Sequence, residues 1–385
     1  MNHICFVVNK YPNRYEPYML IFLQQLAWTM ADMGKKVTVI CPLPINLNPS
    51  YRKLPLQTVE TTEKGGKITV YRPRTFGFGQ SHYIFGKSPV GITTHFMETS
   101  AEKVIKSLED KPDVIYGHFL APSGIVSARL GRKFGIPAFF AYGEAHDTIG
   151  QFGVEKAKKE LGSVSGVIAV SSYLKNQLVN AGIVDKNKIE VFPNGINSER
   201  FYQRDKIKSR QEFGLPEDAV IAGFVGAFNE RKGILRVCRA IDQVEGVQLI
   251  CAGKGELEPQ SEKCIFKKSL TPDQIPVFNS ASDFFVLPTL NEGCSNAIVE
   301  AMSCGLPIIS SNRAFNDDIL DEECSIRIDP ENIDEIREAI KQLVEDSKRR
   351  NRMSAAALRK AAELTLEERA NRIIRFIESR IEECK

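Results

Sequence analysis

Short apolar runs alternate with longer stretches of helical periodicity along most of the chain. Apolar runs of this kind, separated by glycine, proline and charged residues, are typical of strands that are buried on both faces of a parallel sheet. The predicted strands of the first half are His3–Asn9, Lys36–Cys41, Pro112–Tyr116, Pro137–Tyr142, Gly166–Val170 and Lys188–Phe192. The helical stretches between them include Tyr18–Met33, Ser123–Phe134 and Ser172–Asn180. This alternation predicts an α/β fold.

Two interruptions divide the pattern. The stretch from Pro42 to Pro89 is rich in proline, glycine and basic residues and predicts a long irregular region. A polar stretch from Ser198 to Gln211 precedes a second series of elements, which are Ile221–Ala227, Gly233–Val244 and Val247–Ala252. With 385 residues, the chain is too long for one ordinary core. We therefore predict two Rossmann-like doubly wound domains, residues 1–200 and 201–365, that face each other across a cleft, and a helix over 366–385 that packs back on the first domain.

The composition, with 43% hydrophobic and 26% charged residues, is that of an ordinary water-soluble globular protein. No apolar run is long enough for a membrane span, and Met1–Lys10 is typical of a first strand and not of a signal peptide. The nine cysteines are scattered without Cys-x-x-Cys spacing, which indicates reduced thiols and argues against a metal cluster. We therefore expect a cytoplasmic protein.

The net charge of +3 is distributed unevenly along the chain. Residues 1–200 hold 24 Lys and Arg against 16 Asp and Glu, a net of +8, and residues 201–385 hold 27 against 32, a net of −5. The excess in the first half suggests an anionic partner such as lipid head groups or a lipid phosphate, although a mixed solvated surface explains the count more simply. Nucleic acid is disfavoured, because basic runs such as Lys156–Lys159 lack interleaved aromatic residues.

The segment Glu292–Glu300 carries the clearest chemical pattern in the chain. It lies between a predicted strand, Phe284–Pro288, and a predicted helix that Ser295 or Asn296 caps and Gly305 ends. Loops in this position lie at the carboxyl ends of parallel strands, where ligands bind. Helix N-termini bind phosphate oxygens, and nearby carboxylates accept hydrogen bonds from hydroxyl groups. The segment therefore predicts a site for sugar and ribose hydroxyls beside a phosphate.

Several segments together resemble glycosyltransferase family 4, and the similarity covers most of the chain. Glu292–Pro307 resembles the paired-glutamate motif of this family, and Gly226–Gly233 resembles its glycine–basic phosphate loop. Further similar segments are Asp113–His118, Ala169–Ser172 and Val191–Asn197. The resemblance implies the GT-B fold and the retaining transfer of a sugar from a nucleoside diphosphate sugar to a hydroxyl group, with a UDP-sugar favoured over a GDP-sugar.

The resemblance also implies roles for individual residues. The catalytic candidates are His118, Arg231, Lys232 and Glu292. The donor-binding candidates are Gly293, Cys294, Ser295, Asn296 and Glu300. From their own positions, and not from the resemblance, Glu144 and His146 follow the predicted strand Pro137–Tyr142; with Arg14 and Asn194 they are the candidates for the acceptor side or the cleft, although an ordinary polar loop explains Glu144 and His146 equally well. In this assignment Glu292 contacts the hydroxyls of the donor sugar, Glu300 contacts the ribose, and the two cations hold the diphosphate. We expect no cofactor and no metal, because Arg231 and Lys232 balance the charge of the diphosphate.

Local electrostatics favours the same role for the basic pair, because cations at the start of a helix are unfavourable unless an anion binds there. The chain departs from the family pattern at two places. Ala227 stands where members often have an arginine, and we expect Arg231 to supply that charge. The loop Lys10–Pro17 has no glycine, where many members have a pair, and we expect it to shape the acceptor site.

The family mechanism is thought to be front-face displacement, in which the departing diphosphate helps to deprotonate the acceptor. We expect the acceptor to be a glycan or a lipid-linked intermediate of surface polysaccharide synthesis, with peripheral contact to the inner face of the cell membrane and no role for nucleic acid. One alternative is a nucleotide-sugar epimerase of similar fold. Another is a non-catalytic partner subunit of a transferase, which the intact Lys232, Glu292 and Glu300 disfavour.

Overall fold

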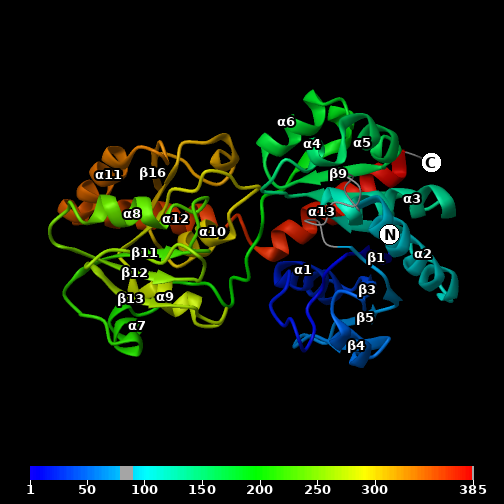
Figure 1. The fold of residues 1–385 in the computed structure, drawn as a ribbon, viewed down its shortest axis with the longest axis horizontal. Coiled ribbons are helices and arrows are strands. Elements are labelled where there is room, and N and C mark those ends of the chain that lie inside the picture. The colour runs from blue at the N-terminus through cyan, green and yellow to red at the C-terminus, as the bar shows by residue number, and fades with distance from the viewer. Residues whose placement is uncertain (79–89, 384–385) are drawn as a thin grey trace. The chain divides into compact units, whose positions relative to one another are not determined.

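The computed structural model describes residues 1–78 and 90–383. The chain forms two compact units, Met1–Phe192 with Arg369–Lys385, and Pro193–Glu368 (Figure 1). Each unit has a mainly parallel sheet of its own with helices packed against it, which confirms the predicted α/β class and the two doubly wound sheets. The prediction that the two domains face each other across a cleft stays a prediction.

The first unit contains an eight-stranded sheet in the order β10-β9-β8-β7-β1-β2-β5-β4. All neighbouring strands are parallel except β4 and β5, which form an antiparallel hairpin at one edge. The strands are β1 (His3–Val7), β2 (Lys36–Ile40), β4 (Gln57–Thr61), β5 (Lys67–Tyr71), β7 (Val114–His118), β8 (Ala138–Tyr142), β9 (Gly166–Ala169) and β10 (Ile189–Val191). The central strands are buried along their whole length, as their apolar runs predict.

Helices cover both faces of this sheet. Apolar side chains of α1 (Ile21–Asp32) and α13 (Leu366–Glu383) form the core on one face. Those of α2 (Val90–Ser107) and α3 (Ile125–Phe134) form a second cluster with other side chains of β1 and β7. The remaining helices of this unit are α4 (Thr148–Phe152), α5 (Val154–Leu161) and α6 (Ser172–Asn180).

The stretch from Pro42 to Pro89 is more regular than its composition predicts. Its described part contains β4 and β5 and a separate two-stranded sheet of β3 (Leu43–Pro44) and β6 (Arg74–Thr75). The sequence hides β4 because it is an edge strand whose side chains are largely exposed, so no apolar run marks it. Residues 79–89 of the predicted irregular region lie outside the described residues.

The second unit contains a six-stranded parallel sheet in the order β13-β12-β11-β14-β15-β16. Its strands are β11 (Val220–Val225), β12 (Val247–Ala252), β13 (Cys264–Lys268), β14 (Phe284–Leu287), β15 (Ile308–Ser311) and β16 (Ser325–Ile328). Its helices are α7 (Lys206–Phe213), α8 (Ile234–Ile241), α9 (Ile275–Ala281), α10 (Asn296–Ser303), α11 (Ile333–Glu345) and α12 (Ser347–Ala361). Gly305 follows α10 with a φ of +79°, as a glycine after a helix end does.

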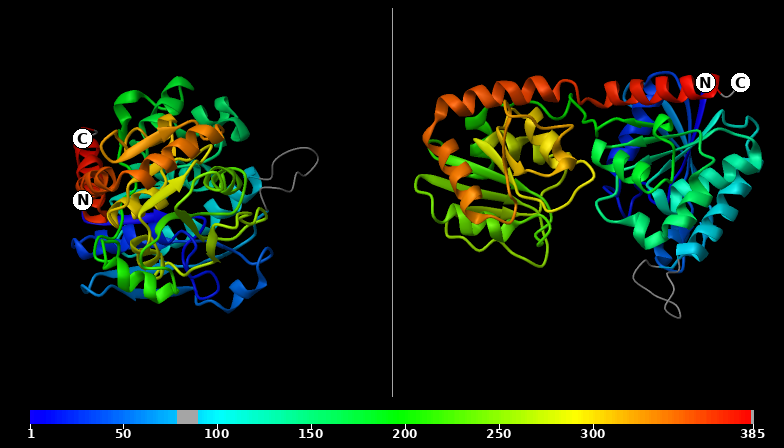
Figure 2. Two further views of the ribbon diagram at one scale, coloured as in Figure 1. Left: turned by 90° about the vertical axis from the view of Figure 1, so that its left-hand side faces the viewer. Right: turned by 90° about the horizontal axis from the view of Figure 1, so that it is seen from above.

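The last helix, α13, belongs to both units. It begins within the second unit and continues from Arg369 in the first, where Ile373 and Ile377 are fully buried in the core. The far end of α13 lies beside the N-terminus (Figure 2). There Glu378 lies 3.7 Å from the N-terminal amine and 3.0 Å from Lys35 Nζ. The first unit is therefore assembled from the two ends of the chain.

Candidate active site

The predicted donor-site residues follow two neighbouring strands in the middle of the second unit. β11 pairs with β12 on one side and with β14 on the other, so the order of the strands reverses at this point. The crevice that binds ligands in a doubly wound sheet opens at the carboxyl ends of such strands. The loop after β11 carries Arg231 and Lys232, and the loop after β14 carries Glu292.

Hydrogen bonds within the loop after β11 hold its basic pair in place. Asn229 Oδ1 accepts a hydrogen bond from Lys232 N at 3.0 Å. Gly233 has a φ of +80°, which side chains rarely adopt, and a Cβ at this position would lie 2.8 Å from Pro288 O. Glycine at 233 therefore lets this loop approach the end of β14 closely.

Glu292 joins the two loops through one carboxylate oxygen. Its Oε1 accepts a hydrogen bond from Arg231 Nη1 at 2.7 Å and forms an ion pair with Lys232 Nζ. Thr289 Oγ1 donates to the same oxygen at 3.1 Å. Only 7% of Glu292 is exposed. Arg231 and Lys232, which we expect to bind the diphosphate, are therefore paired with Glu292, which we expect to contact the donor sugar.

The start of α10 has groups of the kind that bind phosphate in other proteins. Ser295 occupies the N-cap position, and its buried hydroxyl has no hydrogen-bond partner within the described residues. The first amides of a helix lack intrahelical partners and bind anions. Asn194 Nδ2 donates to Cys294 O at 3.3 Å and to Asn296 Oδ1 at 2.8 Å, which places Asn194 at this helix start. Gly293, the remaining donor-binding candidate of this loop, is buried.

Glu300 lies in the second turn of α10. Burial raises the pKa of its carboxyl to about 7, against the lowering effect of the nearby charges of Arg200 and Lys232. Within the described residues, burial and the charges of Arg200 and Lys232 are the only effects on this carboxylate and no hydrogen bond is among them, so it can accept hydrogen bonds from ligand hydroxyls. Sequence reasoning missed Arg200, whose Nη2 lies 3.0 Å from Asp273 Oδ1. Its position in the polar stretch 198–211 gave no signal for a role in the site.

In the first unit, His118 ends β7, where the strand order reverses between β1 and β7. It is 3% exposed, and its ring centroid lies 5.2 Å from that of Phe22 and 4.7 Å from that of Phe119. Burial and the charge of Arg369 lower the pKa of His118 to about 3. The imidazole is therefore neutral at pH 7 and suited to a hydrogen bond.

Glu144 holds the loop that begins at His118. Its Oε1 accepts a hydrogen bond from Leu120 N, and its Oε2 accepts one from Gly143 N at 3.0 Å. Burial raises the pKa of this carboxyl to about 7, against the lowering effect of these two bonds. Phe119, directly before the anchored Leu120, has a φ of +71°, which is strained for a residue with a side chain. Glu144 thus fixes the conformation of the loop after β7.

The other two first-unit candidates are exposed. Arg14 Nη2 donates to Tyr15 Oη and to Lys53 O, both at 2.8 Å. His146 O accepts a hydrogen bond from Thr148 N at 2.8 Å. Within the described residues, no hydrogen bond or ion pair joins the side chain of Arg14 or His146 to His118. The structure therefore brings Glu144 to the His118 loop and leaves these two at the surface.

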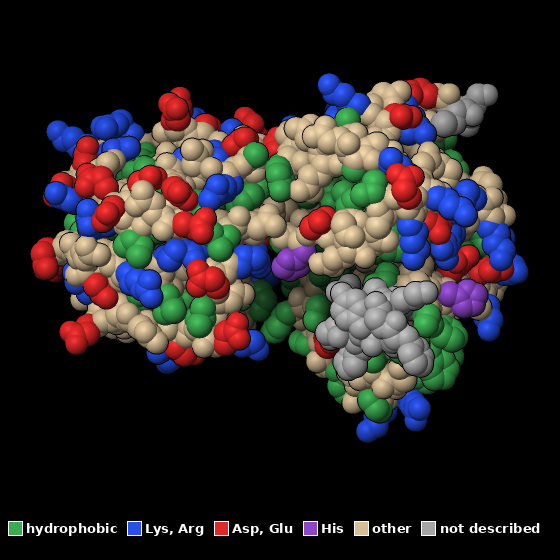
Figure 3. All heavy atoms as spheres, turned by 45° about the horizontal axis from the view of Figure 1, so that its top comes forward, with side chains coloured by type: hydrophobic (Ala, Val, Ile, Leu, Met, Phe, Trp, Pro, Cys, Tyr) green, Lys and Arg blue, Asp and Glu red, His purple; other side chains and the backbone are tan. Residues whose placement is uncertain are grey.

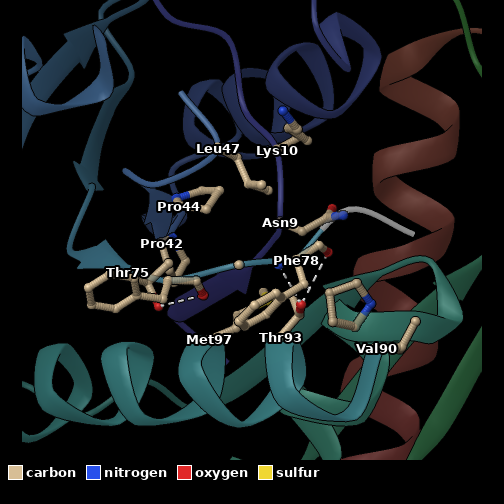
Figure 4. A pocket seen from close by; sticks show the side chains of 13 residues that line it. Asn9, Lys10, Pro42, Pro44, Leu47, Thr75, Phe78, Val90, Thr93 and Met97 are labelled. Carbon is tan, nitrogen blue, oxygen red and sulfur yellow. Dashed lines mark hydrogen bonds between the residues drawn. The ribbon is translucent and has the colours of Figure 1, made fainter. Parts of the chain in front are cut away.

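A cavity of about 280 Å³ opens in the first unit near the ends of β1 and β2 (Figure 4). Its polar members are Asn9, Lys10, Thr75 and Thr93, and its other lining residues are Pro42, Pro44, Leu47, Phe76, Gly77, Phe78, Val90, Met97 and Pro122. Thr93 Oγ1 already bonds with Phe78 N at 3.0 Å, and Thr75 Oγ1 donates to Phe96 O at 3.1 Å. The surface left for a ligand is therefore mainly apolar.

Exposed apolar side chains extend from this cavity to the surface. Leu47 and Phe76 line the cavity and are 53% and 52% exposed. The ring of Phe96 lies 5.8 Å from that of Phe76, between centroids. Figure 3 shows hydrophobic side chains gathered on this unit, whereas acidic and basic side chains are interspersed on the drawn face of the second unit. The apolar surface thus belongs to the unit whose sequence is basic.

None of the helices in residues 1–78 and 90–383 combines the length and the apolar character that crossing a membrane requires. In the same residues, no three His, Cys, Asp or Glu side chains are grouped so that they could hold a metal ion. The expectation that the reaction needs no metal stays a prediction.

Two family models match the chain. The model of Glyco_transf_4, "Glycosyltransferase Family 4", matches residues 21–200, and the model of Glycos_transf_1, "Glycosyl transferases group 1", matches residues 205–360. The Bacillus subtilis (strain 168) glycosyltransferase TuaC, named for teichuronic acid biosynthesis, is 27% identical over 355 residues, which are 88% of each chain.

Solved structures of similar fold are known at lower identity. The sucrose-phosphate synthase of Thermosynechococcus elongatus has a TM-score of 0.76 at 18% identity, over 98% of this chain and 99% of that chain. Anabaena Alr3699/HepE, solved in complex with UDP-glucose, has a TM-score of 0.70 at 15% identity, over 98% of this chain and 99% of that chain.

Proposed function

The chain belongs to glycosyltransferase family 4 and is a retaining glycosyltransferase of the GT-B fold, and from this premise we propose that it transfers the sugar of a UDP-sugar to a hydroxyl group of a lipid-linked glycan in surface polysaccharide synthesis. The observation that carries the donor half is the convergence of Arg231, Lys232 and Glu292 beside the start of α10, with Glu300 in its second turn. The UDP-glucose complex of Anabaena HepE supports UDP as the nucleotide. The similarity to TuaC supports a surface polysaccharide as the product.

Each part of the donor meets a matching group. The diphosphate carries about two negative charges, which Arg231, Lys232 and the amides at the start of α10 stabilise. The carboxylate of Glu300 accepts hydrogen bonds from the ribose hydroxyls. In the reaction, the bond between the anomeric carbon and the diphosphate oxygen breaks, and the acceptor oxygen bonds to that carbon on the same face. The departing diphosphate takes the acceptor proton, so that the protein contributes positioning and charge stabilisation.

The donor half is tested with UDP-glucose in the absence of any acceptor. We expect a rise in melting temperature, since a ligand at 100 times its Kd adds about 2.7 kcal/mol of stability. We also expect slow release of UDP, because water replaces the missing acceptor. GDP- and ADP-glucose are the matched controls and should give smaller shifts.

Two outcomes would contradict this proposal. A melting temperature that is unchanged by all uridine, guanosine and adenosine diphosphate sugars would remove the donor site. Conversion of the sugar to an epimer without release of UDP would instead identify a nucleotide-sugar epimerase.

The acceptor half is carried by the apolar cavity of the first unit. A plain glycan is recognised by polar side chains with free hydrogen-bonding groups, and Thr75 and Thr93 are already bonded within the protein. We assign the cavity to the apolar chain of the acceptor and its phosphate to Lys10, a lining cation whose Nζ also lies 3.5 Å from Glu16 Oε1. A lipid-linked acceptor would also bring the enzyme to the inner face of the cell membrane.

Leu47→Asp is expected to weaken binding of farnesyl phosphate, used as a short polyprenyl phosphate, at least about tenfold. The substitution removes an apolar lining side chain, and covering such a side chain with the ligand contributes about 1.5–3 kcal/mol of binding free energy. It also places a negative charge in the cavity. Leu56→Asp is the matched control, because Leu56 is 61% exposed and does not line the cavity. Titration calorimetry measures both variants, with inorganic phosphate as the probe without a chain. Equal affinities of the two variants, or inorganic phosphate binding as tightly as farnesyl phosphate, would refute the assignment.

A further inference from the structure

The cations of the proposed donor site are already neutralised by a residue of the same chain. Lys232 and Glu292 have side chains that are 13% and 10% exposed, and their ion pair lies between the loops after β11 and β14. Arg231, at 29% exposure, binds the same carboxylate oxygen. Buried charges are stable only when they are paired. A diphosphate that binds these cations therefore competes with Glu292 for them.

The ligand and the carboxylate differ in charge. Glu292 brings about one negative charge to two cations, whereas the diphosphate of a nucleotide sugar brings about two and that of UDP, with its ionisable terminal phosphate, brings more. A ligand with one negative charge, such as a phosphate diester, interacts with the two cations about as strongly as Glu292 already does, so it gains little free energy by replacing Glu292. Either diphosphate gains from both cations, so charge alone does not decide between the nucleotide sugar and the nucleotide.

The displaced carboxylate needs new hydrogen-bond donors, because leaving it unpaired in a nearly buried position is unfavourable. The hydroxyl groups of a sugar attached to the diphosphate can supply them. UDP without a sugar cannot. Displacing Glu292 from the two cations therefore costs less free energy when the UDP-sugar binds than when UDP binds.

We propose that Glu292 is an internal counter-ion for Arg231 and Lys232 that makes the site select nucleoside diphosphate sugars over nucleoside diphosphates. This inference rests on the proposed donor site. When the sugar has left with the acceptor, Glu292 returns to the two cations and competes with the product for them. Glu292 therefore determines specificity and also promotes release of the nucleoside diphosphate.

Glu292→Gln separates this role from a purely structural one, because it predicts a gain of affinity. The amide keeps the shape of the side chain but no longer competes as an anion. We expect pyrophosphate and UDP to bind the variant at least about tenfold more tightly than the wild type. The ratio of the UDP to the UDP-glucose dissociation constant should fall by a similar factor. Titration calorimetry with these three probes measures all of the constants.

Glu230→Gln is the matched control. It removes the same charge one residue before Arg231, but its carboxylate pairs with Arg236 and is 68% exposed. We expect unchanged affinities for the three probes. Thr289→Val serves as a second variant in case Glu292→Gln does not fold. It removes the hydroxyl that donates to Glu292 at 3.1 Å and should give a smaller gain in the same direction.

The outcomes separate the inference from the proposed function. Suppose that pyrophosphate and UDP bind the wild type, but bind Glu292→Gln and Thr289→Val no more tightly than the wild type. The counter-ion role is then refuted and the donor site stands. If neither probe nor UDP-glucose binds any of these proteins, the donor site itself is refuted. An equal gain in Glu230→Gln would show a general effect of net charge and would also refute the counter-ion role.

Discussion

Lys232→Ala is expected to lower kcat/KM for the UDP-sugar roughly 30- to 5,000-fold. The estimate corresponds to about 2–5 kcal/mol, the cost of removing one partner from a buried, hydrogen-bonded charge pair. Because Glu292 keeps its bond to Arg231 at 2.7 Å, we expect the variant to fold and the loss to fall on donor binding and on the leaving diphosphate. Initial rates at varied donor concentration measure this loss.

The matched control is Lys206→Ala. Lys206 Nζ lies 2.7 Å from Asp283 Oδ1, just before β14 and therefore at the opposite edge of the sheet from the donor site. We expect near-normal kinetics from this variant. Lys232→Ala with wild-type turnover would show that Lys232 does not contact the diphosphate.

Donor binding is expected to strengthen as the pH rises through 7 and to level off above it. Burial raises the pKa of Glu300 to about 7, so its carboxyl is about half protonated at that pH. The ionised form accepts hydrogen bonds from both ribose hydroxyls, whereas the protonated form has lost part of this capacity. Well below pH 7, the affinity for UDP-glucose should fall by up to about tenfold per pH unit. UDP-glucose is the suitable ligand, because its diphosphate diester does not titrate in this range.

Glu300→Gln should remove this pH dependence and weaken binding at pH 8 by about 1.5–3 kcal/mol for each hydrogen bond to the charged group that is lost. Glu144→Gln is the control, because it removes the other carboxyl whose pKa is about 7 and leaves Glu300 in place. Calorimetric titration between pH 5.5 and 9 follows all three proteins. An unchanged pH profile in Glu300→Gln would exclude Glu300 as the ribose ligand.

Much of the fold could be predicted because its signals are local. Runs such as Phe284–Leu287 identify buried strands, and a glycine such as Gly305 marks where the following helix ends. The parallel order then places the loops that carry Arg231 and Glu292 at one edge of the sheet. Strand β4 was missed because the exposed side chains of an edge strand leave no apolar run in the sequence.

The missing parts of the site depend on contacts between distant residues. The sequence indicated that Lys232 and Glu292 serve one ligand, but their ion pair spans 60 residues of chain and needs both loops in place. Arg200 lies near Glu300 because of the path that the polar stretch 198–211 takes in the fold. That stretch has no hydrophobic periodicity from which its path could be predicted. His118 was identified at a strand end, while its low pKa results from burial against Phe22 of α1 and cannot be inferred from its neighbours in the chain.

The course of α13 has a consequence for the order in which the protein is made. A ribosome completes the second unit, which ends at Glu368, before it has synthesised the helix that closes the first. Until then, the pocket that receives Ile373 and Ile377 stays open beside α1 and exposes apolar surface. The N-terminal unit, although its strands are synthesised first, can be completed only after α13 has been made, and we expect a nascent chain halted before residue 369 to need a chaperone.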